Sequence, residues 1–215
     1  YLERVNTSNQ NDYCRPGSFW HTILLIEFAN LYVAWEVPEQ ALFYSQRAEV
    51  QAKKLGFSIL LARAINAKGA AQRQLALWEP AKDNLTHALR LFREESAPAF
   101  ECNTLTQLVQ LHLSLEEIAE IQTYSEALWL LLHSDTVDGT NAELIKAWWV
   151  CYRTFQSLHN ARAEIALQRA NELLQNQLDH IHDEAWKNDF VTQIVEHRML
   201  RSTQAAYSQE DKQAI

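Results

Sequence analysis

The sequence predicts an all-α fold, a right-handed α-solenoid of about four helical hairpins with a C-terminal capping helix. Three observations lead to this prediction. The 215 residues include only four glycines and four prolines, too few for the tight turns that β-sandwiches, barrels and doubly wound sheets require. Amphipathic helical periodicity continues almost without a break from Ser18 onward. Small residues also recur at intervals of about 40 residues, which is typical of a repeat architecture.

The chain opens with a polar stretch, residues 1–17, which ends in Arg-Pro-Gly and is typical of a linker. Ser18 is a favourable N-cap for a first helix. This helix should end before Pro38, because the residue that precedes a proline avoids the α region. Pro38 suits the first turn of a second helix, which should end at Gly56, where glycine can adopt the left-handed C-cap conformation.

The same alternation of helix and break continues along the rest of the chain. We expect further helices over residues 58–77, 80–95, 99–113, 116–133, 142–158 and 161–178, and a last helix over 183–206. The chain is therefore divided into an N-terminal linker, a helical repeat domain, a C-terminal capping helix with its junction, and a flexible tail. These parts span residues 1–17, 18–178, 179–206 and 207–215.

The first expected helix is apolar on two sides. One stripe comprises Phe19, Ile23, Ile26, Asn30 and Val33, and the other comprises Trp20, Leu24, Phe28, Leu31, Tyr32 and Trp35. A helix that is apolar on two sides is expected to be buried between neighbouring helices. Trp35 and Trp78, which precede the prolines of the second helices, are expected to fill gaps between repeats.

Small residues mark the expected contact between the two helices of each hairpin. Pairs seven positions apart lie on the second helices, at Ala41/Ala48, Ala81/Ala88, Ile121/Leu128 and Ala163/Ala170. Twelve residues before each pair lies another small or modest residue: Ala29, Gly69, Val109 and Cys151. Where two helices cross closely, only a small side chain fits between the backbones. We therefore expect these residues to form a buried seam.

This layout resembles the tetratricopeptide repeat (TPR), which has a small residue on its first helix, an aromatic residue three positions later, and Ala-x6-Ala on its second helix. The best match is Ala29-x2-Tyr32-x8-Ala41-x6-Ala48. The second unit has Gln72 in the aromatic position, and the third has His112 there, which we expect to be packed and hydrogen-bonded. The resemblance covers residues 18–178 as four units, and it implies a protein- or peptide-binding module.

The C-terminal stretch carries a second resemblance. Ala170-Asn-Glu-Leu-Leu174, Asp183-Glu184-Ala185, Phe190-Val191 and Arg198-x-Leu200 are similar to the closing segment of TPR arms on large multidomain signalling ATPases and cyclase-linked or transcriptional regulators. Lys187 stands where that family usually has arginine. The resemblance implies that the chain is the sensor or regulatory arm of a larger signalling protein.

Independently of that resemblance, the last segment is suited to covering the end of a helical array. Asp183 and Glu184 favour a helix N-terminus through the macrodipole. Terminal repeats need a cover for their apolar face. We expect one buried face on this helix, formed by Trp186, Phe190, Ile194 and His197.

Composition argues against several functions. The net charge of −8 argues against nucleic-acid binding by a general basic field. The four glycines are too far apart to form a phosphate-binding loop. The apolar run from Ile23 to Trp35 is too short to cross a bilayer, so no membrane partner is expected.

The cysteines and the start of the chain give two further expectations. Cys14, Cys102 and Cys151 are widely spaced and odd in number, which favours a reduced, cytoplasmic setting. The chain begins at Tyr1 and its only methionine is Met199, so we expect it to be a piece of a longer protein.

If the first helices of successive hairpins line a concave surface, that surface can bind a ligand. It would carry Asn30, Arg63, Asn66, Arg73, Asn103, Thr106, Gln110, Trp148 and Tyr152. Asparagine can hold a peptide backbone, and Arg63 and Arg73 can grip a carboxylate. Trp148 and Tyr152, one turn apart, can form an aromatic shelf, with one of Trp148 and Trp149 in the core and the other facing the groove. The alternative is that these are solvated polar positions.

These observations predict a non-catalytic protein- or peptide-interaction module that needs no cofactor and no metal ion. The expected partner is a protein or peptide, and an acidic or C-terminal carboxylate group would suit the arginines. One alternative is a constitutive scaffold for partner subunits, with a homodimer among the open arrangements. Another is a metal-dependent enzyme that uses His180 and His182, whose simpler interpretation is a polar junction with surface histidines.

Overall fold

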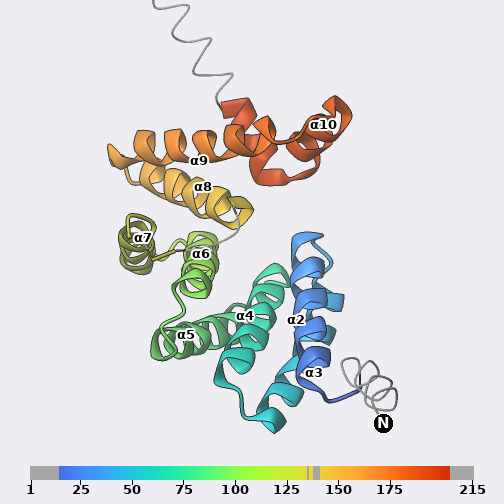
Figure 1. The fold of residues 1–215 in the computed structure, drawn as a ribbon. Coiled ribbons are helices and arrows are strands. Elements are labelled where there is room, and N and C mark those ends of the chain that lie inside the picture. Colours follow the sequence, from blue (N-terminus) through green and yellow to red (C-terminus); the bar gives the residue numbers. More distant parts are fainter. Residues whose placement is uncertain (1–14, 135, 138–140, 204–215) are drawn as a thin grey trace, which may run out of the picture. The chain divides into compact units, whose positions relative to one another are not determined.

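The computed structural model describes residues 15–134, 136–137 and 141–203. Figure 1 shows these residues as a series of helices: α2 (Phe19–Ala34), α3 (Pro38–Leu55), α4 (Ser58–Gln74), α5 (Trp78–Glu94), α6 (Pro98–Leu115), α7 (Ile118–Leu132), α8 (Asn141–Ser157), α9 (Arg162–Asp179) and α10 (Glu184–Gln193). A further helical stretch covers residues 195–203. The expected tail, residues 207–215, and most of the expected linker lie outside the described residues.

The chain divides into two compact units, Tyr1–Leu111 and His112–Ile215, and α6 crosses the boundary between them. In the first unit, α2 pairs with α3 and α4 pairs with α5, while α2 and α3 both contact α4. In the second unit, α8 pairs with α9 and also contacts α7. The expected all-α fold of successive helical hairpins is therefore confirmed, and the helices within residues 58–178 begin and end within three residues of their expected bounds.

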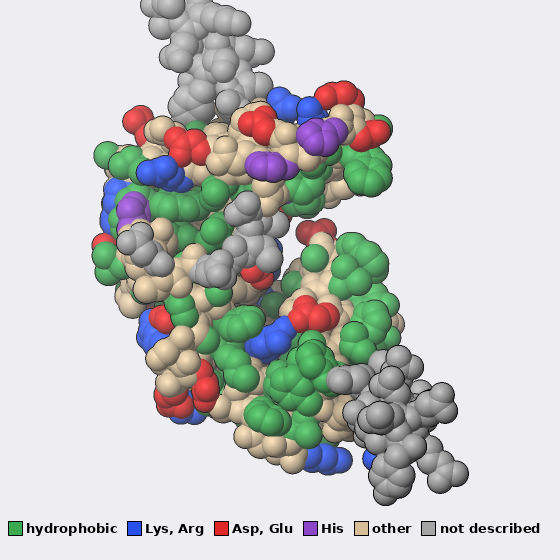
Figure 2. All heavy atoms as spheres, in the orientation of Figure 1, with side chains coloured by type: hydrophobic (Ala, Val, Ile, Leu, Met, Phe, Trp, Pro, Cys, Tyr) green, Lys and Arg blue, Asp and Glu red, His purple; other side chains and the backbone are tan. Residues whose placement is uncertain are grey.

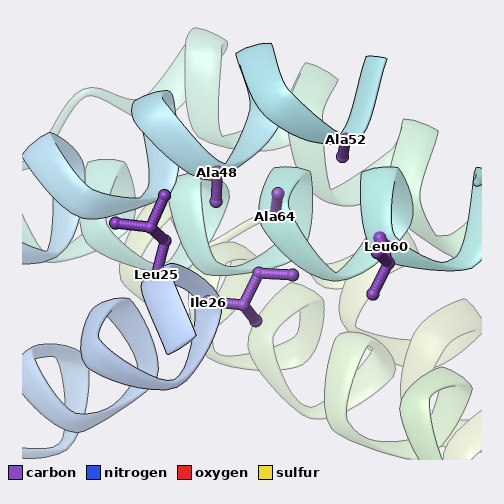
Figure 3. Packing of buried hydrophobic residues seen from close by; sticks show 6 residues of the cluster. All are labelled: Leu25, Ile26, Ala48, Ala52, Leu60 and Ala64. Carbon is purple, nitrogen blue, oxygen red and sulfur yellow. The ribbon is translucent and has the colours of Figure 1, made fainter. Parts of the chain in front are cut away.

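The small-residue seam lies inside the hairpins as expected. Ala41, Ala48, Ala81 and Ala88 are completely buried. Figure 3 shows how alanines let the helices approach in the first unit: Ala48 and Ala52 of α3 point towards α4, close to Leu25 and Ile26 of α2 and to Leu60 and Ala64 of α4. In the fourth hairpin the expectation is only partly right, because Ala163 is half-buried while Ala166 and Ala170 are fully buried.

The turns between helices explain why so little glycine is needed. A non-glycine residue with positive φ ends the helix at five of them: Glu36, Ala76, Ser96, Glu116 and His159. At each turn the following N–H donates to the carbonyl five residues earlier, as Leu77 does to Gln72 at 2.9 Å. This is the Schellman arrangement, which satisfies carbonyl groups left free at a helix end. This turn usually has glycine at the position with positive φ, whereas these five turns have other residues there.

The C-terminal helix is interrupted, whereas a single helix over 183–206 was expected. α10 ends at Gln193, and Ile194 is extended, with φ −91° and ψ 121°. The β-branched residues around the break are weak helix formers, and two side chains satisfy the carbonyls that the break frees. His197 Nδ1–H donates to the Phe190 carbonyl at 3.0 Å, and Arg198 donates to the Thr192 carbonyl at 3.3 Å.

This interruption also changes which residues the C-terminal segment buries. Trp186 is 73% exposed, so its expected place on the buried face is wrong. His197 is buried as expected, Phe190 and Ile194 are half-buried, and Val191 and Leu200 are also buried. The expected role of Asp183 is confirmed, because its carboxylate accepts a hydrogen bond from the Trp186 backbone N–H at 2.9 Å and caps α10.

Candidate functional site

Side chains on the first helices of the hairpins in the first unit form a polar ladder between α4 and α6. Asn66 Nδ2 donates to Asn103 Oδ1 at 3.2 Å, and the Thr104 hydroxyl donates to Asn66 Oδ1 at 2.9 Å. Arg73 Nε donates to Gln107 Oε1 at 3.2 Å. Asn66, Arg73 and Asn103, which were expected to contact a ligand, therefore lie close together. Their side chains form hydrogen bonds between α4 and α6. We call this set, with the Arg63 contacts below, the A-helix ladder.

Arg63 extends the ladder to α2. Its guanidinium forms an ion pair with Glu27 and lies over the ring of Phe100, 5.1 Å from the ring centroid. The Arg63 side chain is only 17% exposed, whereas that of Glu27 is 53% exposed. Because an ion pair and a cation–π contact both hold the guanidinium, a carboxylate ligand would have to displace Glu27 to reach it.

The other predicted groove residues are divided between surface and core. Asn30 is exposed and Gln110 is half-buried. Thr106, Trp148 and Tyr152 are buried, so the expected aromatic shelf is wrong. The indole of Trp148 packs edge-to-face on that of Trp129, with centroids 5.5 Å apart.

Trp149 is also buried, and of the two adjacent tryptophans Trp148 reaches an opening, which lies in the second unit and not on the predicted groove. A pocket of about 270 Å³ opens in the second unit among the end of α7, α8 and α9, and Trp148 forms part of its wall. Arg169 and Glu172 also line it and form an ion pair at 2.9 Å, so each compensates the charge of the other.

The outer face of α2 is an exposed apolar surface of the first unit. Four large side chains lie there at successive turns of the helix and a fifth at its C-cap: Trp20, Leu24, Phe28, Leu31 and Trp35, which we call the α2 stripe. Their exposed fractions are 49%, 44%, 46%, 39% and 63%. Figure 2 shows hydrophobic side chains gathered over the part of the surface where Figure 1 places α2 and α3.

The structure corrects the expectation that both sides of α2 are buried. The inner side is buried through Leu25, Ile26 and Val33, but the α2 stripe is open among the residues that the structure describes. Trp35 does not fill a gap between repeats, and Trp78 is half-buried. The sequence pattern identified both apolar sides correctly and could not show whether a helix covers each of them.

The repeat shows what normally covers this face. Forty residues later, the positions of Trp20, Leu24, Phe28 and Leu31 are taken on α4 by Leu60, Ala64, Lys68 and Ala71. Leu60, Ala64 and Ala71 are buried in clusters that include Ala41, Ala48 and Ala52 of α3.

Lys68, at the third of these positions, pairs with Glu49 of α3, at 2.6 Å between Nζ and Oε2. The helix α3 of the preceding hairpin therefore covers this face of α4. On α2 the same face is apolar throughout, and its position equivalent to Lys68 is Phe28.

Aromatic contacts hold the α2 stripe against α3. Phe28 lies 5.4 Å from Tyr44 between ring centroids, and Tyr44 stacks on Tyr32 at the same distance with the rings 7° from parallel. Tyr32 in turn contacts Trp35 edge-to-face at 5.9 Å. These contacts restrict the rings before any partner binds, which lowers the entropy lost on association.

The segment between α9 and α10, which contains His180 and His182, does not form a comparable binding surface among the described residues. His180 Nδ1 contacts the Asn176 carbonyl of its own helix at 2.6 Å, and His182 is exposed. In the described part of the chain, no three histidine, cysteine or acidic side chains come close enough together to hold a metal ion. Within residues 15–203 as described, no helix is both long and apolar enough to span a bilayer.

Comparison with known proteins gives a match at the level of fold. No protein-family model and no curated protein matches this sequence. Among solved structures, the chain is similar to the crystal structure of BtubC (BKLC) from P. vanneervenii, with a TM-score of 0.55 and 19% sequence identity. The match covers 76% of this chain and 66% of that chain, so it spans less than two thirds of BtubC. At this identity the likeness supports the helical fold alone.

Proposed function

We propose that this chain is a non-catalytic protein-interaction module and that the α2 stripe is its docking surface. The observation that carries the proposal is the exposure of five large apolar side chains on one face of a helix. Glu27 is the only Asp, Glu, Lys or Arg in α2. Contiguous apolar patches of this kind mark interaction sites in soluble proteins.

The size of the patch supports a protein partner. With full side-chain areas of about 150–250 Å² for the large residues, the α2 stripe exposes roughly 500 Å². At about 25 cal/mol/Å², covering it gives a gross gain of about 12 kcal/mol. Association entropy and side-chain ordering remove a large part of this gain. The remainder is enough for stable docking when the partner is complementary in shape.

The regulatory-arm role is the more specific form of this proposal. It is supported by the resemblance of the repeats to TPR units and of the C-terminal stretch to the closing segment of TPR arms. In this form, a partner on the α2 stripe biases an effector domain by binding one of its states more tightly. Cys102 and Cys151 are buried and form no disulfide, which supports a reducing, cytoplasmic setting.

One observation favours the alternative of a constitutive scaffold over reversible capture of a peptide. The A-helix ladder residues Asn66, Asn103 and Arg73 are satisfied within the chain. A peptide that used them would have to replace these hydrogen bonds, so its net gain would be small. An apolar surface such as the α2 stripe, by contrast, is best covered permanently.

The test is binding to the wild-type chain and to two charge variants. The immobilised chain is exposed to a lysate of the source organism, and each captured protein is purified and its Kd is measured by calorimetry. We expect the double variant Leu24→Glu, Leu31→Glu to weaken binding at least about 30-fold, since central interface residues contribute about 2 kcal/mol or more each. Leu130→Glu, at a still more exposed leucine on α7, is the control.

Two outcomes would contradict this proposal. A purified partner that binds the double variant as tightly as the wild-type chain, or loses as much affinity with Leu130→Glu, contradicts the α2 stripe as the docking surface. The circular dichroism spectrum of each variant verifies that the helices are intact.

A further inference from the structure

The residues of the α2 stripe have the same order in both directions. From the N-terminus they are Trp20, Leu24, Phe28, Leu31 and Trp35, so the sequence of side chains is Trp, Leu, Phe, Leu, Trp either way. The two tryptophans and the two leucines are centred on one point, midway between residues 27 and 28. The side chains are largest at the ends and the aromatic ring of Phe28 lies next to the centre.

We propose that a second copy of this chain covers the α2 stripe, with the two α2 helices antiparallel about a two-fold axis beside Phe28. A symmetric dimer needs a self-complementary surface, on which residue i contacts j and j contacts i. The stripe has this property, because in the antiparallel register Trp20 meets the second copy's Trp35 at both ends. Leu24 meets the second copy's Leu31, and the two Phe28 rings meet at the axis. This inference rests on the proposed function, since both use the α2 stripe.

Charge does not oppose this arrangement. The only formally charged side chain of α2, Glu27, lies beside the proposed axis, so two copies bring two carboxylates near each other. Each carboxylate is paired with Arg63 of its own chain. The ion pair compensates the charge of Glu27, and like-charge repulsion across the axis is correspondingly reduced.

The area is sufficient for a dimer. With roughly 500 Å² from each copy, the two α2 stripes remove roughly 1,000 Å² from water, which is the lower limit for a specific interface. The exposed rings of Phe43 and Phe57 belong to the same aromatic network: Phe43 contacts Tyr44, and Phe57 contacts Phe19, which itself contacts Trp20. They provide additional apolar surface close to the stripe.

The first experiment measures the mass of the 215-residue chain in solution. We expect sedimentation equilibrium to give twice the 24.9 kDa of one chain at micromolar concentration. Leu24→Glu with Leu31→Glu should raise the dimer dissociation constant at least about 30-fold, and Leu130→Glu should leave it unchanged. A wild-type chain that stays monomeric at high micromolar concentration overturns the inference, as does a dimer that both variants leave intact.

The second experiment tests the register by cross-linking with a short bismaleimide in a Cys14→Ser background. Cys102 and Cys151 are buried and serve as unreactive internal controls. Phe28→Cys should cross-link to itself efficiently. Trp20→Cys should not, because about seven and a half residues at 1.5 Å each separate it from the axis and place the two thiols about 22 Å apart along the helices.

An equimolar mixture of Trp20→Cys and Trp35→Cys chains should cross-link about half as efficiently as Phe28→Cys, because random exchange makes roughly half of the dimers mixed. Efficient self-linking by Trp20→Cys indicates a different helix register and overturns the proposed dimer. The two proposals also fail separately. If the wild-type chain is monomeric and a purified partner no longer binds the Leu24→Glu, Leu31→Glu variant, the dimer is contradicted and the proposed function stands. If a purified partner binds that variant as tightly as the wild type, the proposed function is contradicted.

Discussion

Gly69 on α4 lies directly against Leu85 on α5. A Cβ at Gly69 would lie 2.7 Å from Leu85 Cγ and 3.3 Å from the Leu85 backbone nitrogen. The branch point and the backbone of Leu85 cannot move away as a flexible side-chain end can. We therefore expect Gly69→Ala to lower the free energy of unfolding by about 1–3 kcal/mol through overpacking, despite the better helix propensity of alanine.

Chemical denaturation measures this effect. Gln46→Ala, at an exposed position of α3, is the control and should change the free energy of unfolding by less than about 0.5 kcal/mol. A Gly69→Ala protein as stable as the wild type would show that α4 and α5 do not cross as closely as the structure has them.

The turn residue Ala76 has φ 56°, a left-handed conformation that side chains with a Cβ adopt at a cost. Ala76→Gly removes that strain but adds conformational freedom to the unfolded chain. We expect a net gain of about 0.5–1 kcal/mol in the free energy of unfolding. Gln46→Gly, within a regular helix, should instead lose about 1 kcal/mol relative to alanine at the same site. Equal losses at both sites would contradict the assigned turn conformation.

We expect Asn66 to contribute to the stability of the fold. Its amide donates to Asn103 and accepts from the buried hydroxyl of Thr104. Asn66→Ala removes both bonds and should cost about 1–3 kcal/mol. Asn30→Ala, at an exposed site on α2, should have no measurable effect on unfolding. If Asn66→Ala is neutral in stability but abolishes a thermal shift caused by peptides, the A-helix ladder is a ligand site after all.

His197 predicts a pH dependence in the C-terminal segment. Burial lowers the pKa of its imidazole below 6.5, although the Phe190 carbonyl and Glu196 favour the cation. The unfolded chain therefore binds a proton below about pH 6.5 that the folded chain does not bind until lower pH. We expect stability to fall as the pH decreases through that window, and His197→Gln to remove this part of the dependence.

The neighbouring carboxyl acts in a separate pH range. Burial raises the pKa of Glu196, but Lys146, 3.2 Å away, more than offsets this and leaves the pKa below its ordinary 4.5. Its contribution is present above about pH 4.5 and is lost below it. Thermal melts between pH 7 and 5 thus separate the effect of His197 from that of Glu196. His182→Gln, at an exposed histidine, is the control, and an identical pH profile for His197→Gln and the wild type would contradict the assignment.

The seam could be predicted from the sequence because its physical cause is local. Ala41, Ala48, Ala81 and Ala88 recur at fixed spacing, and a close helix crossing requires small residues at those points. The buried place of His112 follows from the same register, and its ring indeed stacks on Tyr124 at 5.2 Å and contacts Glu117.

The α2 stripe and the C-terminal break could not be predicted in this way. Periodicity shows that Trp20 and Leu24 share an apolar face, but only tertiary structure shows whether a helix covers it. The break at Ile194 depends on hydrogen bonds from His197 and Arg198 to carbonyls seven and six residues earlier in the chain. Trp148 is buried because aromatic residues of α7 and α8 meet, a contact that no single-helix pattern contains.

Side-chain footprinting of the tryptophans tests the central claim most directly. Hydroxyl radicals oxidise exposed indoles, and Trp20, Trp35 and Trp186 are exposed to 49%, 63% and 73% in the isolated chain. If the α2 stripe is a docking surface, oxidation of Trp20 and Trp35 should fall several-fold together as protein concentration rises or a purified partner is added, while Trp186 stays constant. Trp20 and Trp35 that remain as reactive as Trp186 under every condition would contradict the account.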